Sequence, residues 1–260
     1  MSGLEGRVCI VSGVGPGTGR AIALSLGRAR ARLVLACRTE EAARETAAEA
    51  ERAGAEAIGV AMDVTKPEDR ARVVGSALNA FGRIDVLVNN AFATGRPGLV
   101  ESSDLVKGWR TAFEVNLFGG LALAQAVLPS MKKSGGSIVM VGSLAGRKPQ
   151  PGLAAYGASK AALLAAARSL AAECGHSQIR VNTVVPGHID GPNLAVHVEQ
   201  EARRLGTSVE AVRRTIAAEG VLERIATPDE VAEAVTFFAS PASSGITGQS
   251  LDVNCGQWFD

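Results

Sequence analysis

Hydrophobic residues occur in short runs rich in Val, Ile and Leu, and longer segments rich in Ala, Glu and Arg separate these runs. This alternation predicts repeated β–α–β units. Several runs are apolar at every position, which is typical of strands buried on both faces of a parallel sheet. We predict an α/β, doubly wound fold with helices on both faces of a mostly parallel sheet of about seven strands, at residues 7–12, 32–37, 56–62, 84–89, 137–142, 179–185 and 249–253.

Helix-start signals help to divide the second half of the chain. Two Thr-x-x-Glu segments, at 207–210 and 227–230, predict capping boxes, the second with Pro at the first helical position. The stretch 188–222 is long for a simple connection, and we expect two helices interrupted at Gly206. We find no linker or repeat, so the chain is predicted to form a single dinucleotide-binding and catalytic domain, 1–260, with 188–222 as a substrate-loop or lid insertion.

A glycine-rich turn follows the first predicted strand. The segment Ser12-Gly13-Val14-Gly15-Pro16-Gly17-Thr18-Gly19 leads directly into a helical pattern. Glycines let the backbone approach a pyrophosphate closely, and the free N–H groups and dipole of a helix N-terminus favour its charge. A glycine cluster alone could be a plain structural turn, but its position between a strand and a helix favours a dinucleotide site. The predicted fold is therefore of the Rossmann type.

The end of the second predicted strand should face the adenosine ribose of such a dinucleotide. Cys37 stands there, followed by Arg38, where an Asp or Glu would instead accept hydrogen bonds from a free 2'-hydroxyl. A guanidinium can pair with a 2'-phosphate, so NADP is favoured over NAD. Pro16, where a second basic residue would help, and the nearby Glu40 and Glu41 keep NAD possible. The alternative for Arg38 is a solvated charge at a helix entrance.

A possible acid/base unit lies in the middle of the chain. Ser143 follows a strand end, where ligands bind in open α/β folds. Tyr156 and Lys160 are four residues apart on a predicted helix, so they share one face. A neighbouring ammonium favours the ionised form of a phenol, whose pKa is ordinarily near 10. Taken alone, however, a Tyr and a Lys at this spacing often form a surface pair.

Together these segments resemble the short-chain dehydrogenase/reductase family, in its compact single-domain branch. The resemblance covers essentially the whole chain, through Ser12-Gly13-x-x-x-Gly17-x-Gly19, Asn89-Asn90-Ala91, Asn116, Ser143, Tyr156-x-x-x-Lys160, Pro186-Gly187 and Thr247-Gly248-Gln249. It implies that Tyr156 is the general acid or base on a carbonyl or alcohol oxygen, which Ser143 also hydrogen-bonds. It implies that Lys160 binds the nicotinamide ribose and lowers the pKa of Tyr156, and that Asn116 holds a water of a proton relay.

The resemblance also assigns cofactor contacts. Asp63 would bind the adenine with the Val64 backbone beside it, Asn90 would lie against the adenosine ribose, and Ile189 would offer backbone groups to the nicotinamide amide. A helix cap is the alternative for Asp63, and Asn89 is expected to tie neighbouring loops together. The predicted cofactor-binding set is Gly13, Pro16, Gly17, Thr18, Gly19, Arg38, Asp63, Val64, Asn90, Tyr156, Lys160 and Ile189.

The chain departs from the family pattern at several positions. Phe92 replaces a Gly after Asn-Asn-Ala, and its ring could either narrow the active-site floor or pack in the core. Gly191 stands where a Thr commonly contacts the carboxamide, so that contact is lost or supplied by another group. Ser12 replaces a Thr but keeps a hydroxyl. For His188, substrate orientation and simple solvation are both open.

Composition limits the partners and the compartment. The formal net charge is +1, which argues against nucleic acid or an anionic membrane as the main partner. The apolar stretch 161–167 is too short to span a bilayer. The four cysteines have neither zinc-site nor disulfide spacing, so we expect no metal and a reduced, cytoplasmic protein. The segment 152–173 is Ala-rich on nearly every side, which predicts a homo-oligomer, with burial by its own domain as the alternative. The family resemblance implies a tetramer, and a dimer is also possible.

The predicted function is hydride transfer between NADP(H), or NAD(H), and a small-molecule ketone or secondary alcohol. The alternative from another class is a non-catalytic protein that senses nicotinamide nucleotides with the same fold. An epimerase or dehydratase would generally need a larger C-terminal part, and an enoyl reductase of the divergent branch would space its Tyr and Lys more widely.

Overall fold

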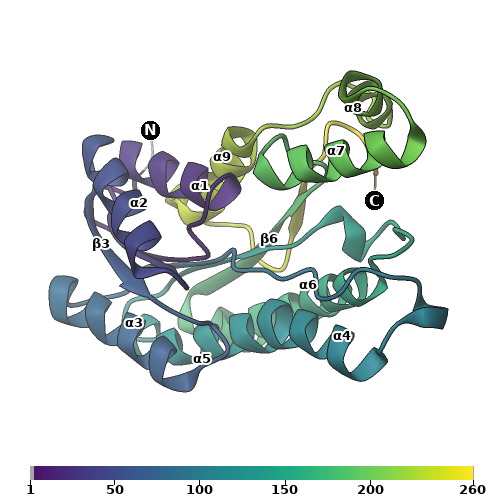
Figure 1. The fold of residues 1–260 in the computed structure, drawn as a ribbon. Helices are drawn as coiled ribbons and strands as arrows, with labels where there is room; N and C mark the ends of the chain where they lie inside the picture. The colour runs from purple at the N-terminus through teal and green to yellow at the C-terminus, as the bar shows by residue number, and fades with distance from the viewer. Residues whose placement is uncertain (1–2, 260) are drawn as a thin grey trace.

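Seven strands form one sheet in the order β3-β2-β1-β4-β5-β6-β7, in a computed structural model that describes residues 3–259 (Figure 1). Every neighbouring pair is parallel. The predicted strands are confirmed, with ends that differ by at most two residues. The strands are β1 (Val8–Ser12), β2 (Arg32–Cys37), β3 (Glu56–Ala61), β4 (Val86–Asn89), β5 (Gly136–Val141), β6 (Ile179–Pro186) and β7 (Ser250–Val253).

Helices cover both faces of the sheet. In Figure 1, α1, α2 and α9 lie above it and α3, α5 and α6 below it. The helices are α1 (Thr18–Arg28), α2 (Glu40–Arg52), α3 (Pro67–Phe81), α4 (Leu105–Phe113), α5 (Gly120–Met131), α6 (Ala154–Cys174), α7 (Pro192–Leu205), α8 (Val209–Ala218) and α9 (Pro228–Ala239). Shorter turns are η1 (Val100–Ser102), the π-helical η2 (Glu114–Gly119), η3 (Leu144–Gly146), η4 (Gly175–Ser177) and η5 (Pro241–Ser243). The doubly wound α/β fold is thus confirmed.

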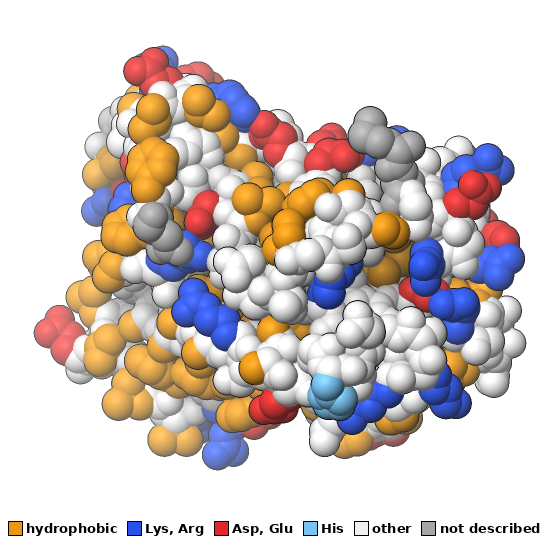
Figure 2. Space-filling model, turned by 180° about the vertical axis from the view of Figure 1, so that it is seen from behind, with side chains coloured by type: hydrophobic (Ala, Val, Ile, Leu, Met, Phe, Trp, Pro, Cys, Tyr) orange, Lys and Arg blue, Asp and Glu red, His pale blue; other side chains and the backbone are white. Residues whose placement is uncertain are grey.

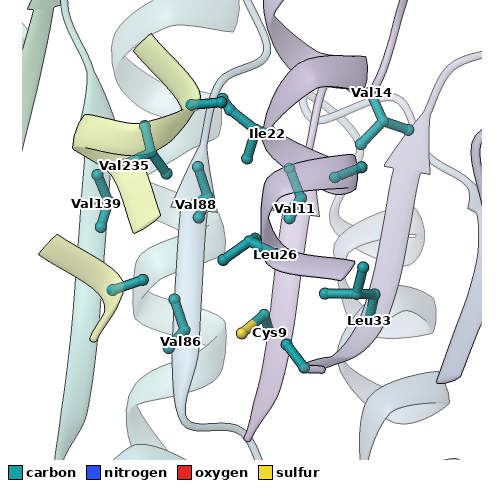
Figure 3. Packing of buried hydrophobic residues seen from close by; sticks show 14 of the residues in the cluster. Cys9, Val11, Val14, Ile22, Leu26, Leu33, Val86, Val88, Val139 and Val235 are labelled. Carbon is teal, nitrogen blue, oxygen red and sulfur yellow. The ribbon is translucent and has the colours of Figure 1, made fainter. Parts of the chain in front are cut away.

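The two faces of the sheet have separate cores. Figure 3 shows Ile22 and Leu26 of α1 and Val235 of α9 packed onto alternate strand residues such as Val11 and Val88. Residues that point to the other face, such as Ile10 and Leu87, pack against α3, α5 and α6. This burial on both faces explains why the strand sequences are apolar at nearly every position.

Sheet order places a crevice at one edge. The chain builds β1, β2 and β3 outwards and then crosses back to place β4 on the other side of β1. The connections that leave β1 and β4 therefore diverge at their carboxyl ends, where open α/β sheets bind ligands.

Helices α7 and α8 lie over this carboxyl edge, at the upper right in Figure 1, and share a small apolar cluster. The predicted interruption is confirmed: α7 ends at Leu205, and Gly206 has a φ of 64°. The capping box predicted at 207–210 is wrong, because Ser208 caps α8 and its hydroxyl accepts a hydrogen bond from the Ala211 N–H at 3.1 Å. The box predicted at 227–230 is confirmed at the start of α9.

One helical run is more apolar than the sequence stretch 161–167 suggested. The continuous run Leu105–Met131, formed by α4, η2 and α5, is long and apolar enough to cross a membrane by length and composition. Its Leu123, Val127 and Met131 are buried against the sheet, as in the core helix of a globular domain. Length and composition alone are therefore weak evidence for a membrane span here.

Candidate active site

A cavity of about 860 Å³ opens at the carboxyl edge of the sheet. That volume is in the range of small-molecule and cofactor sites. Its wall comes from the glycine-rich turn, the ends of β5 and β6, the start of α6, and α7. The structure brings into this wall ten of the predicted site residues: Gly13, Pro16, Gly17, Thr18, Gly19, Asn90, Ser143, Tyr156, Lys160 and Ile189.

The glycine-rich turn is shaped by close backbone contacts. Gly13 has a φ of 81°, and a Cβ there would lie 2.6 Å from the Ala91 backbone. A Cβ on Gly19 would lie 2.1 Å from the carbonyl oxygen of Gly13. The Asn90 side chain donates a hydrogen bond to the same carbonyl at 2.7 Å. Only glycine fits at these two positions, and Asn90 fixes the turn to the end of β4.

The start of α1 has the properties of an anion site. Gly17 precedes the helix with a φ of 93°, no side chain caps its first turn, and that turn contains no acidic residue. No heavy atom lies within 4 Å of the position that a Cβ on Gly15 would take. The N–H groups and the dipole therefore face an open cavity, so the residues present fit the pyrophosphate of a dinucleotide.

Three predicted cofactor residues lie outside the cavity wall. Arg38 is exposed after β2, and its charge helps to lower the pKa of Asp63. The larger cause of that lowering is the Thr65 hydroxyl, which donates to the Asp63 carboxylate at 2.7 Å. Asp63 is not a helix cap, because Lys66 holds that position before α3. Val64 is buried, and its carbonyl oxygen accepts a hydrogen bond from Arg70 at 2.8 Å.

Ser143, Tyr156 and Lys160 meet on one side of the cavity. Ser143 follows β5 and hydrogen-bonds Tyr156. The Lys160 Nζ lies 5.8 Å from the centre of the Tyr156 ring and donates to the Val141 carbonyl oxygen at 2.7 Å. The i, i+4 spacing on α6 and the end of β5 thus place a phenol, an ammonium and a hydroxyl together.

Burial changes the proton affinities of this group. Desolvation raises the pKa of Tyr156, and the hydrogen bond with Ser143 opposes that rise. Desolvation also lowers the pKa of Lys160 to about 7. Lys160 is not among the groups that shift the pKa of Tyr156, so the expected lowering of that pKa by Lys160 is not found, and desolvation dominates instead.

The Asn116 side chain fixes the backbone around the site and lies outside the cavity wall. It donates to the Ala93 carbonyl oxygen and accepts from the Ala93 N–H, each at 2.8 Å, and donates to the Ser159 hydroxyl at 2.8 Å. It thereby joins the loop after β4 to α6, beside Lys160. The surrounding η2 is π-helical, a local irregularity that is frequent at functional sites.

The structure locates two residues at which the chain departs from the family pattern, Phe92 and Gly191. Phe92 lines the cavity, is 47% exposed, and meets the Tyr156 ring edge-on at 6.4 Å between centroids. Its ring therefore narrows the site and does not pack in the core. Gly191 precedes α7 with extended backbone and lines the cavity, and it has no side chain to make the contact that a Thr would make.

Two further predictions concern residues around the site. The Asn89 amide donates to the carbonyl oxygen of Gly120, the first residue of α5, at 3.1 Å, so it ties β4 to a helix, whereas a contact between loops was predicted. The Ser12 hydroxyl keeps a role, since it accepts from the Ala91 N–H at 3.4 Å. Among residues 3–259 no cluster of His, Cys, Asp and Glu could hold a metal ion.

Seven polar residues that line the cavity were not named individually from the sequence. Asn193, His197, Gln200 and Glu219 lie on α7 or directly after α8, within the segment 188–222 that was predicted as a substrate loop or lid. Thr94, Lys148 and Gln150 were missed, because they lie in loops away from any motif. His188 also lines the cavity, and its backbone N–H donates to the Gln257 side chain at 2.9 Å.

Comparisons with known proteins identify related sequences over nearly the whole chain. The family profile described as "Enoyl-(Acyl carrier protein) reductase" matches residues 13–257. The chain is 35% identical to the 3-oxoacyl-[acyl-carrier-protein] reductase FabG of Vibrio cholerae, over 98% of this chain and 99% of that protein.

Two solved structures are also similar. A putative short-chain alcohol dehydrogenase from Sinorhizobium meliloti has a TM-score of 0.89 and 31% identity, covering 98% of this chain and 97% of that one. An NADH-dependent reductase, A1-R', described as responsible for alginate metabolism, has a TM-score of 0.86 and 29% identity, with 100% of both chains covered.

The fold and the crevice define an NAD(P)-dependent α/β oxidoreductase acting on alcohol or ketone groups. More specifically, the chain belongs to the short-chain dehydrogenase/reductase family.

Proposed function

We propose that this protein transfers a hydride between NADP(H) and a small ketone or secondary alcohol, with Tyr156 as the general acid or base. The observation that carries the proposal is the convergence of Ser143, Tyr156 and Lys160 on one cavity with the uncapped start of α1. The nicotinamide cofactor supplies the hydride when bound. The protein groups orient the substrate and move the proton.

Each side chain has a separate task in this proposal. Tyr156 gives a proton to the carbonyl oxygen in reduction and removes one from the alcohol in oxidation. Ser143 donates a hydrogen bond to the same oxygen and stabilises its developing charge. Lys160 binds the nicotinamide ribose. Asn116 positions the loop after β4 and holds a water that continues a proton relay from Lys160. Burial raises the pKa of Tyr156 and so favours its protonated form, which is the form that donates the proton in the direction of reduction.

The rest of the cofactor would be held along the crevice. Gly13, Pro16, Gly17, Thr18 and Gly19 surround the pyrophosphate position, and Ile189 lies at the nicotinamide end. Asp63, Val64 and Asn90 are assigned to the adenosine half. Arg38 is exposed and free to approach a 2'-phosphate, which supports NADP over NAD. NAD remains the second cofactor, since a similar solved structure is named as an NADH-dependent reductase.

Turnover with a panel of ketones and secondary alcohols, followed by nicotinamide absorbance with NADP(H) and NAD(H), tests the function. Tyr156→Phe is expected to lower kcat by at least about 100-fold, because the general acid is lost, while the Kd for NADPH stays within about twofold. Near-normal turnover in that variant would refute the role. Cofactor binding without turnover of any panel compound by the unmodified protein would favour the nucleotide-sensing alternative.

The wider organisation is part of the same proposal. The whole chain 1–260 acts as one domain, and 188–222, which contains α7 and α8, is the substrate lid. The protein works as a homo-oligomer, a tetramer or a dimer, in the cytoplasm, without membrane or nucleic-acid partners. Free cysteines, three of them buried, agree with a reducing compartment.

A further inference from the structure

One part of the cavity wall carries charge that the proposed chemistry does not use. Lys148 follows η3, five residues after Ser143, and Glu219 stands at the end of α8. The Lys148 Nζ lies 3.4 Å from the Glu219 Oε2, and both side chains line the cavity. The pair therefore joins the loop beside the reacting groups to the lid helices.

Two imidazoles belong to the same wall. His188 and His197 line the cavity, and Glu219 and Lys148 both act electrostatically on His188. Burial is the main reason that the pKa of His188 is lowered, and Glu219 opposes it. Among the described residues that line the cavity, Glu219 is the one carboxylate, whereas two lysines, Lys148 and Lys160, line it.

The contact between Lys148 and Glu219 is weak enough for a ligand to replace Glu219. Its 3.4 Å separation is longer than the roughly 2.7–2.9 Å of a charge-assisted hydrogen bond. The two side chains are 39% and 38% exposed, so solvent screens the pair, and such pairs contribute at most about 1 kcal/mol. An acid group on a ligand could replace Glu219 beside Lys148 at little cost. Nearby Phe92, Leu144 and Leu153 supply an apolar wall for the part of the ligand between its two polar ends.

We propose that the substrate is a keto acid or hydroxy acid, whose carboxylate is bound by Lys148 in place of Glu219 while its carbonyl or alcohol lies at Tyr156. This rests on the proposed function of the site. Lys148 is then the group that selects anionic substrates, and His188 and His197 add donors around the carboxylate. Glu219 competes with the substrate for Lys148 and keeps the lysine paired when the cavity is empty.

Binding of hexanoate and of its neutral analogue hexanamide, measured by titration calorimetry with and without NADP⁺, tests the proposal without turnover. We expect hexanoate to bind more tightly, by about tenfold or about 1.4 kcal/mol. Lys148→Gln should remove this preference, and Glu219→Gln should increase it, because the competing carboxylate is gone. Lys133→Gln, an exposed charge change outside the cavity, is the matched control and should leave the preference unchanged.

Turnover gives a second readout. For straight-chain keto acids of increasing length and their methyl esters, the ratio of kcat/KM for acid over ester should fall about tenfold in Lys148→Gln and rise in Glu219→Gln. If the Lys148–Glu219 pair only held the loop and the lid together, Lys148→Gln and Glu219→Gln would change the acid-over-ester ratio of kcat/KM in the same direction. That result, or equal binding of hexanoate and hexanamide, overturns the proposal. Retained carboxylate selectivity in calorimetry with no turnover of any compound would instead reject the redox function.

Discussion

Burial sets the chemistry of individual residues in this protein as much as their identity does. Tyr156 and Lys160 were paired from their spacing, and the structure places them together as expected. Their pKa shifts, however, come first from desolvation, which no spacing reveals. Arg38, in contrast, is exposed, and its proposed role depends on its charge alone.

The buried amine of Lys160 predicts a pH dependence of stability. Its pKa is about 7 in the folded protein and 10.5 in the ordinary, unfolded case. Between these values the unfolded chain binds a proton that the folded chain does not, so the free energy of unfolding rises with pH. We expect urea unfolding to show that wild type gains stability relative to Lys160→Met between about pH 7 and 10. Lys133→Met, at an exposed site, should follow wild type, and parallel curves for Lys160→Met would contradict the assignment.

Cofactor choice is a second residue-scale prediction. If Arg38 pairs with the 2'-phosphate, Arg38→Ala should lower the ratio of kcat/KM for NADPH over NADH by about tenfold or more, because a hydrogen bond to a charged group contributes about 1.5–3 kcal/mol. Steady-state kinetics with both cofactors measure the ratio. Arg52→Ala, an exposed arginine in the last turn of α2, is the control. An unchanged ratio in Arg38→Ala would leave Arg38 as a solvated charge.

At the scale of elements, local sequence determined most of the positions where strands and helices begin and end. The strands were predicted within two residues because burial on both faces leaves an apolar sequence. The two Thr-x-x-Glu segments had different outcomes. Thr227 and Glu230 cap α9 reciprocally, whereas Ser208, one residue later than predicted, caps α8. Two adjacent hydroxyl residues satisfy the same pattern, so the sequence alone could not choose between them.

Matched substitutions at these caps test the difference. Thr227→Ala should lower the free energy of unfolding by about 1 kcal/mol, because the Glu230 N–H and the cap hydroxyl lose their hydrogen bond. Thr207→Ala should change it by less than about 0.5 kcal/mol, since Thr207 does not cap α8. Denaturant unfolding of both variants measures the effects. An equal loss in the two would contradict the cap assignment.

At the scale of the whole molecule, one surface remains more apolar than a monomer needs. Leu105, Val106 and Phe118 are exposed on the run from α4 to η2, and Ala161 and Ala165 are exposed on the neighbouring α6. Figure 2 shows hydrophobic side chains gathered along the left side of the molecule in that view. Such a surface is typical of an interface between subunits, which supports the proposed homo-oligomer.

Sedimentation at micromolar concentration tests the assembly. The protein should sediment as a dimer or a tetramer, and Val106→Glu, a residue 67% exposed in the single chain, should shift it to a smaller species. The subunits should separate because the carboxylate introduced at position 106 would be buried at the interface without a partner. Val221 is 70% exposed and follows α8, outside the apolar surface of α4 and η2. Val221→Glu should therefore not change the sedimenting mass. A monomeric profile of the unmodified protein would contradict the proposal.

The sequence by itself determined the strand pattern, the glycine turn and the residues of the reacting group. Each depends on neighbours along the chain: alternate faces of a strand, a backbone position that excludes a side chain, or a four-residue spacing on a helix. Asn116 was also found by its motif, although its hydrogen bonds to Ala93 and Ser159 were not.

Only the tertiary structure decided which residues from distant segments share the cavity. Lys148 and Glu219 are 71 positions apart, and neither belongs to a motif, so their contact exists only because the fold brings the end of α8 to the loop after η3. Phe92 was ambiguous until its ring was found beside Tyr156. Local patterns specify elements because the interactions are local, whereas the substrate pocket is formed by side chains that the fold alone brings within reach.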